Sequence, residues 1–246
     1  MPLIEELEAS GRWLFRRRSY LPVVMVIVIF PSLKYFSYPF GSVLLDHIWE
    51  WFCLLVGFGG LIVRGLVAGY VPQRTSGRNA KQHVADTLNT TGMYSVVRNP
   101  LYLGNFLISL AVALFLRVWW VPLIYMLSFM LYYERIIFAE EMFLRQKFGE
   151  DYLAWASRTP AFFPKLSQWQ RPTLSFSLRT LVRREYRSAY GFIMALFALE
   201  QLTELYLGHG WPMDAMWIWI VGSATCGYLI ARFLHKKTGL LRVEGR

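Results

Sequence analysis

Two short groups of polar residues in this chain have types and spacing that suit chemistry at a membrane surface. The first, Arg98-Asn99-Pro100, stands directly before an apolar stretch. Because proline favours the first turn of a helix, Pro100 predicts a helix whose free N–H groups and positive dipole end attract an anion. The second group is the carboxylate pair Glu140-Glu141. Together they predict a pocket with an anion-accepting end and a carboxylate end, which suits a zwitterionic ligand.

The apolar blocks between these groups predict how they meet. The blocks 101–116 and 119–138 are separated only by Arg117-Val118, so they predict a tight antiparallel helical hairpin. Such a hairpin returns Glu140-Glu141 to the level of Pro100.

An alternative reading makes the same residues ordinary features of a membrane boundary. Arg98 and the two glutamates would then be interfacial charges, and Tyr94 and Tyr102 would belong to an aromatic belt. The order and spacing of the whole set favour a site.

The composition places these groups in a membrane protein. Hydrophobic residues make up 55% of the 246 residues and charged residues 17%, with a mean hydropathy of +0.34. Soluble domains carry about 25% charged residues, and a disordered chain would be far less apolar. We predict an all-α fold, a polytopic bundle of about six transmembrane helices near residues 21–40, 48–70, 101–116, 119–138, 188–207 and 215–234.

The basic residues predict the orientation of this bundle. The chain has 26 Lys and Arg against 16 Asp and Glu, a net charge of +10. With a cytoplasmic N-terminus, all of these cations except Lys34 and Arg117 fall on the cytoplasmic side, a strong positive-inside bias. Both termini and the site are therefore expected on that side. The basic charge reflects topology and attraction to anionic lipid, and nucleic acid is not an expected partner.

The chain divides into N-terminal transmembrane helices (1–71), a central core (72–164) and a basic linker with two further helices (165–246). The core begins with a polar loop that is a candidate for ligand binding. It ends with the segment from Glu140 to Trp155, which alternates apolar and charged residues and is interrupted by Gly149. We predict an amphipathic helix lying on the lipid headgroups there.

Other motifs point to packing rather than to chemistry. The sequence has no phosphate loop, no Gly-x-Ser-x-Gly turn and no paired metal-ligand histidines, so no metal site is predicted. Cys53 and Cys226 lie in apolar blocks, without disulfide or zinc spacing. The glycines of 57–60 and 65–69 predict close helix approach. His83 lies in the polar loop, which leaves a site role open for it.

The ordered set of motifs resembles the integral-membrane methyltransferases typified by isoprenylcysteine carboxyl methyltransferase, with the phospholipid N-methyltransferases as wider relatives. The shared pattern runs from Leu88 to Pro164 and reads Gly92-x-Tyr94, Arg98-Asn99-Pro100-x-Tyr102-x-Gly104, a helical hairpin, Glu140-Glu141-x-x-Leu144, Phe148-Gly149-x-x-Tyr152 and a closing Pro164. The resemblance implies that S-adenosylmethionine binds at the cytoplasmic ends of the hairpin helices. It also implies a lipid acceptor that enters from the bilayer.

Carried over position by position, the resemblance implies which residues contact the cofactor: Gln82, Leu88, Asn89, Tyr94, Asn99, Pro100, Tyr102 and Glu140. Two positions depart from the family pattern. The usual histidine is Asn99 here, which forms hydrogen bonds but cannot carry a full proton charge. The arginine that the family links to the substrate carboxylate falls on Ile136, and its neighbour Arg135 points about 100° away on a helix.

The chemistry of the donor sets the demands on the protein. A sulfonium methyl is transferred by in-line displacement, so the enzyme mainly aligns the acceptor and excludes water. An ionised carboxylate or phosphate needs no general base, and Arg98 or Arg135 is expected to hold it through a bidentate contact. An amine or hydroxyl acceptor would require Glu140 or Glu141 as a base.

The sequence thus predicts methyl transfer to an anionic oxygen of a lipid or lipidated substrate, with catalytic roles for Arg98, Arg135 and Glu141. The alternatives are a phospholipid N-methyltransferase, then a membrane reductase that uses NADPH, or a non-enzymatic transporter. In the transporter reading, Glu200 and Glu204, one helical turn apart, would form a pathway.

Overall fold

The computed structural model describes residues 2–17, 21–38, 41–72, 75, 85–211 and 214–245, and within these ranges the chain is helical without a β-strand. The predicted all-α fold is therefore confirmed. The longer helices are α1 (Leu3–Arg16), α2 (Leu21–Ser32), α3 (Val43–Tyr70), α5 (Pro100–Phe115), α6 (Trp120–Ala156), α7 (Leu178–Tyr206) and α8 (Ala215–Phe233). The short ones are η2 (Leu33–Tyr35), α4 (Met93–Val96), η4 (Leu166–Gln168) and η5 (Leu234–Thr238).

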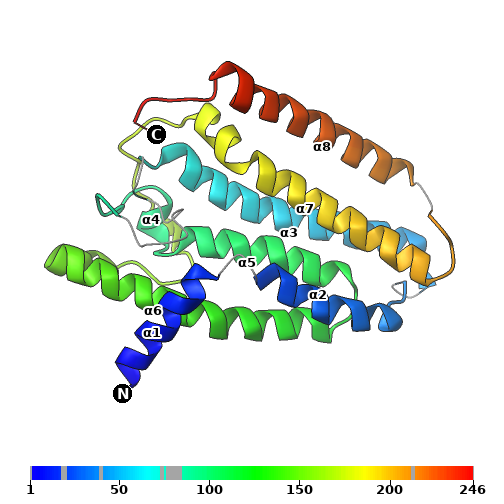
Figure 1. Cartoon of the computed structure of the whole chain (residues 1–246), viewed down its shortest axis with the longest axis horizontal. Coiled ribbons are helices and arrows are strands. Elements are labelled where there is room, and N and C mark those ends of the chain that lie inside the picture. Colours follow the sequence, from blue (N-terminus) through cyan, green and yellow to red (C-terminus); the bar gives the residue numbers. More distant parts are fainter. Residues whose placement is uncertain are drawn as a thin grey trace.

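Three of the described helices are long and apolar enough to cross a bilayer: α3, α6, and α8 with its continuation to Thr238. α5 is apolar but has only 16 residues. The molecule is an integral membrane protein built as a helical bundle (Figure 1). α1 and the C-terminal end of α8 lie at the same end of this bundle as α4 (Figure 1).

Two of the predicted membrane blocks have different bounds in the structure. The block 21–40 forms the 12-residue helix α2 and the turn η2. At 1.5 Å per residue α2 is about 18 Å long, short of the hydrocarbon core of about 30 Å. The block predicted from Ser188 begins at Leu178, because Ser177 Oγ caps the helix by accepting from the Thr180 N–H at 3.2 Å.

The segment from Glu140 to Trp155 is helical, as predicted, and forms the C-terminal part of α6. Its one interruption is Gly149, whose φ of +54° and ψ of −124° lie outside the helical region. Glycine adopts this positive φ without a Cβ clash, which explains the residue type. α1 packs along α6, and Tyr132 Oη donates to the Leu14 carbonyl at 2.9 Å. No sequence pattern had indicated that contact.

Helices α3 and α5 approach closely at two glycines, as the glycine run predicted. A Cβ added at Gly60 would lie 2.6 Å from the Gly104 carbonyl oxygen, and one added at Gly104 would lie 2.9 Å from the Gly60 carbonyl oxygen. Arg64, one turn further along α3, donates to Glu185 of α7 at 2.8 Å and to Asn105 of α5. These hydrogen bonds join α3, α5 and α7 near the C-terminal end of α3.

We expect Gly60→Ala to lower the free energy of unfolding by about 1–3 kcal/mol, because the added methyl forces α3 and α5 apart. Gly59→Ala is the matched control, since a Cβ there meets no described atom within 4 Å. It should leave stability unchanged or raise it by about 0.5–1 kcal/mol, because alanine favours helix over glycine. Unfolding of the detergent-solubilised protein measures both. Equal losses in the two variants would contradict the close approach.

Candidate functional site

A half-open hollow lies where the polar loop, α4 and the start of α5 meet the middle of α6. Counting its mouth and the open solvent there, it contains about 640 Å³ of empty space. We call it the carboxylate hollow. It is lined by Thr75, Ala85, Thr87, Leu88, Asn89, Tyr94, Arg98, Asn99, Glu140, Glu141, Phe143, Leu144, Tyr152 and Trp155.

The start of α5 places Asn99 and Pro100 at this hollow. Pro100 is the first residue of α5, as predicted, and Asn99 is the residue before it. The Asn99 side chain does not cap the helix; its Nδ2 donates to the Ala161 carbonyl at 3.0 Å. The amide therefore joins the beginning of α5 to the loop that follows α6.

The predicted hairpin brings Glu140 back to the first turn of α5. Tyr102 Oη donates to Glu140 Oε2 at 2.8 Å, and the Tyr102 ring lies 4.9 Å from that of Tyr133, centroid to centroid. Tyr102 and Pro100 line a smaller hollow that shares Tyr94 and Glu140 with the carboxylate hollow. The two hollows thus meet at the Glu140 side chain.

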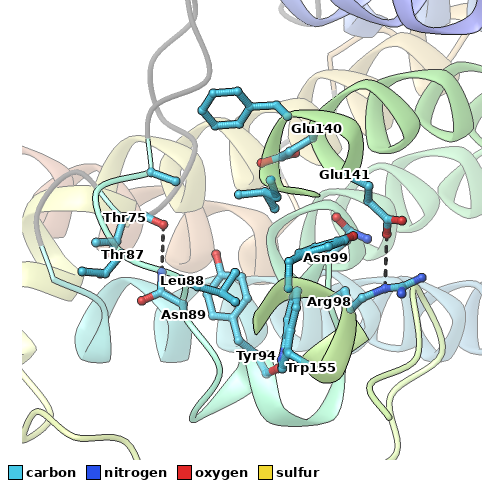
Figure 2. A pocket seen from close by; sticks show the side chains of 14 residues that line it. Thr75, Thr87, Leu88, Asn89, Tyr94, Arg98, Asn99, Glu140, Glu141 and Trp155 are labelled. Carbon is cyan, nitrogen blue, oxygen red and sulfur yellow. Dashed lines mark hydrogen bonds and ion pairs between the residues drawn. The ribbon is translucent and has the colours of Figure 1, made fainter. Parts of the chain in front are cut away.

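Arg98 faces the second carboxylate. Its Nε lies 3.2 Å from Glu141 Oε1, and Nη1 donates to the Ala156 carbonyl at 3.1 Å. Figure 2 shows Glu140 and Glu141 of α6 facing Arg98, Asn99 and Tyr94 across the hollow. With one cation and two carboxylates among its described lining residues, the hollow carries a formal charge of −1 and favours a ligand that bears positive charge.

Tyr94 and Trp155 form the floor of the hollow. Trp155 Nε1 donates to the Tyr94 carbonyl at 3.0 Å, so the end of α6 is bonded to α4. Burial, and secondarily the charge of Glu140, raises the pKa of the Tyr94 hydroxyl above its usual range. Tyr94 therefore stays protonated, and remains a hydrogen-bond donor, across the physiological pH range.

The residues that the sequence singled out fall into four groups, one of which is Pro100 and Tyr102 at the smaller hollow. Those that line the carboxylate hollow are Leu88, Asn89, Tyr94, Arg98, Asn99, Glu140 and Glu141. Of these, Asn89 also donates from Nδ2 to the Thr75 carbonyl at 2.8 Å. Gln82 lies outside the described residues, as does His83. Arg135 lines neither of these two hollows; it is exposed, and its Nη1 donates to Ser10 Oγ of α1 at 3.3 Å.

Sequence reasoning missed the aromatic part of the lining. Phe143, Tyr152 and Trp155 were assigned to a face that rests on lipid headgroups, but they line the hollow. Their helical spacing with Leu144 indicates that they share an apolar face of the helix, but it does not indicate what packs against that face.

A second hollow, almost wholly apolar, lies beside the first on α6. We call it the apolar hollow; it holds about 670 Å³ of empty space, counting its mouth, and is lined by Phe129, Met130, Tyr133, Glu134, Ile137, Phe162 and Phe163. Tyr133 connects it to the site through its ring contact with Tyr102. The loop that bears Phe162 is the one to which Asn99 bonds through Ala161.

The polar residues at the opposite end of the bundle pair with one another. Glu204 accepts from Tyr38 Oη and lies 2.9 Å from His209 Nδ1. Carboxylate oxygens of Glu200, Glu50 and Asp46 lie within 4.8 Å of one another. The two glutamates of the transporter reading therefore contact other buried or loop side chains.

Residues 53–151 match the family model of phospholipid methyltransferases, which confirms the resemblance over this segment. The chain is also similar to two curated proteins. It is 40% identical over 85 residues to the cobalt-zinc-cadmium resistance protein CzcN of Cupriavidus metallidurans, covering 35% of this chain and 39% of that protein. It is 34% identical over 114 residues to the nickel-cobalt-cadmium resistance protein NccN of Alcaligenes xylosoxydans xylosoxydans, covering 46% and 51%.

The matches thus span 39% and 51% of the lengths of these relatives. No solved structure matches the chain.

Proposed function

We propose that this protein transfers a methyl group from S-adenosylmethionine to an anionic oxygen, a carboxylate or phosphate, on a lipid or lipidated substrate. One observation carries the proposal. Within the segment that matches the methyltransferase family, Tyr94, Arg98, Asn99, Glu140 and Glu141 line a single hollow. Their order in the sequence had predicted a common site.

The charge of the carboxylate hollow supports this donor. S-adenosylmethionine supplies a sulfonium methyl and carries an ammonium and a carboxylate, so its charge complements a lining with a formal charge of −1. Glu140, oriented by Tyr102 Oη at 2.8 Å, would face the positive part of the donor. Tyr94 and Asn99 would supply hydrogen bonds, and Trp155 would exclude water from one wall. Preorganised groups of this kind stabilise charge without reorganising during the reaction.

The apolar hollow supports a lipid acceptor. Its lining is apolar except for Glu134, and Met130 and Phe163 are more than half exposed at its rim. An acyl or prenyl chain lying there would place its polar group near Tyr133 and Tyr102, which separate the two hollows. Arg98 would then orient an acceptor oxygen from the far side of the carboxylate hollow. On the charge bias of the sequence, we assign this face and both termini to the cytoplasm.

Methylation of an amine headgroup is the second candidate, and one observation favours it. Arg98 already lies 3.2 Å from Glu141, so an anionic acceptor would have to share its guanidinium, whereas an amine would find a net negative hollow. Nanodiscs that contain either phosphatidic acid or phosphatidylethanolamine, supplied with a methyl-labelled donor, separate the two. Label in phosphatidic acid supports oxygen methylation, and label in phosphatidylethanolamine supports the second candidate.

The donor site is tested first by titrating the detergent-purified protein with S-adenosylhomocysteine in a calorimeter. We expect saturable binding, and a Kd about three- to tenfold higher for Tyr102→Phe, because loss of the hydroxyl leaves Glu140 unoriented. Tyr206→Phe is the matched control, since Tyr206 is 56% exposed at the end of α7. Binding of NADPH in place of S-adenosylhomocysteine would favour the reductase. A folded protein that binds neither would favour the transporter.

A further inference from the structure

A further hollow, which the proposed function does not use, adjoins the carboxylate hollow across Trp155. It holds about 470 Å³ of empty space, counting its mouth. Besides Trp155, its lining consists of polar residues: Thr90, Ser95, Arg158, Thr159, Gln168 and Gln170. We call it the polar hollow. Trp155 also lines the carboxylate hollow, so its indole is the wall common to both.

The walls of the polar hollow are held by backbone hydrogen bonds, so its shape does not depend on a ligand. The Gly92 N–H donates to the Gln170 carbonyl at 3.0 Å, and the Gln170 N–H donates to Ser95 Oγ at 2.9 Å. On the other side, Trp155 Nε1 donates to the Tyr94 carbonyl at 3.0 Å, which joins the end of α6 to α4. Three segments far apart in sequence, the loop before α4, the end of α6 and the segment after η4, are thereby fixed around one space.

The side chains of the polar hollow present donors and one unpaired acceptor. Arg158 is the one charged residue among its described lining residues, and it is exposed to solvent. Thr90 and Thr159 add hydroxyls, and Thr159 is 5% exposed. Gln168 Oε1 is buried and has no hydrogen-bond partner among the described residues. Because an unpaired buried acceptor is costly, this atom indicates a missing donor.

We propose that the polar hollow binds a phosphate monoester or inorganic phosphate. The oxygens of the anion accept from the Arg158 guanidinium and from the threonine hydroxyls, and charge-assisted bonds of this kind are the strong ones. Inorganic phosphate keeps at least one proton at neutral pH, and a monoester, whose second pKa is about 6, keeps one in its monoanionic form; that protonated oxygen donates to Gln168 Oε1. Sulfate has the same shape and charge but no proton at neutral pH, so it leaves Gln168 unpaired. The hollow should therefore prefer phosphate over sulfate.

This site is distinct from the proposed methyl-donor site and does not depend on it. Arg158, Thr159 and Gln168 line the polar hollow and not the carboxylate hollow. Phosphate binding can be measured whether or not the protein binds S-adenosylhomocysteine, so failure of one proposal leaves the other intact.

Equilibrium dialysis of the full-length, detergent-purified protein against labelled inorganic phosphate tests the site. We expect saturable binding of one phosphate per chain. The affinity for sulfate, measured by competition, should be at least about tenfold lower, a difference of about 1.4 kcal/mol in binding free energy. Arg158→Gln should weaken phosphate binding at least about tenfold, the scale of one charge-assisted hydrogen bond. Gln168→Met should reduce the preference for phosphate over sulfate. Arg145→Gln, an exposed change on α6 that lines no described hollow, is the matched control.

Two further arms identify the source of the phosphate. Glycerol 3-phosphate should displace the label if the natural ligand is a free phosphomonoester. Vesicles that contain phosphatidic acid, but not vesicles of phosphatidylcholine alone, should displace it if the ligand is a lipid headgroup. Melting temperatures show whether each variant is folded. Absence of saturable phosphate binding by the folded native protein, or equal binding by Arg158→Gln, would overturn the proposal.

Discussion

Replacing Glu140 with glutamine is expected to lower the rate of methyl transfer about 100-fold or more, the scale seen when one preorganised electrostatic group is removed from an active site. Glu140 is one of two carboxylates in the hollow, and Arg98 lies against the other. The Glu140 carboxylate lines both the carboxylate hollow and the smaller hollow, where the proposed cationic donor would lie against it. Glutamine retains an oxygen that can accept from Tyr102 Oη, so the substitution removes charge while the hydrogen bond at 2.8 Å can persist.

The measurement is transfer of labelled methyl to lipid in nanodiscs, together with titration by S-adenosylhomocysteine. S-adenosylhomocysteine lacks the sulfonium charge, so we expect its affinity to fall less than the rate. Glu150→Gln is the matched control, because Glu150 is exposed on the same helix and lines none of the described hollows. Native rates in Glu140→Gln would remove this carboxylate from the proposed site.

Replacing Arg117 with methionine is expected to lower the free energy of unfolding by about 3–5 kcal/mol, the cost of breaking a buried ion pair by removing one partner. The Arg117 side chain is 4% exposed and pairs with Asp46 and Glu50 of α3, which are 5% and 0% exposed. Its φ of +58° is rare for a residue other than glycine. The turn between α5 and α6 thus holds an unfavourable backbone conformation that delivers a cation to buried carboxylates.

Unfolding of the detergent-solubilised protein measures this effect, and Arg145→Met is the exposed control, expected to change stability by less than about 0.5 kcal/mol. A triple variant that adds Asp46→Asn and Glu50→Gln should recover part of the loss, because it removes the charges that Arg117 had balanced. A single variant as stable as the native protein would show that the carboxylates are neutralised in another way.

Local signals in the sequence determined the helices and the two ends of the site. Apolar blocks of membrane length predicted the bundle, and Pro100 marked the start of α5 because it cannot donate a backbone hydrogen bond within a helix. The short connection at Arg117-Val118 left an antiparallel hairpin as the simple solution. That hairpin alone was enough to predict that Glu140 returns to Tyr102, and the two are hydrogen-bonded.

Helix bounds were harder to predict where a charged residue is paired with an opposite charge on a helix distant in the sequence. The sequence placed residues 178–187 in a basic linker, yet they form the first turns of α7. Glu185 of this stretch lies 2.8 Å from Arg64 of α3, across the bundle. A hydropathy scale scores both residues as polar and takes no account of the ion pair that neutralises their charges.

Tertiary structure alone decided which partner each site residue has. Arg135 and Arg98 were equal candidates to hold an acceptor, but α6 is rotated so that Arg135 faces Ser10 of α1 while Arg98 meets Glu141. Trp155 lies beyond the interruption at Gly149, and its hydrogen bond to the Tyr94 carbonyl places it between the carboxylate hollow and the polar hollow. Periodicity specifies which residues share a helix face. The rotation of each helix about its axis, and therefore what that face meets, is set by packing between segments that are distant in the chain.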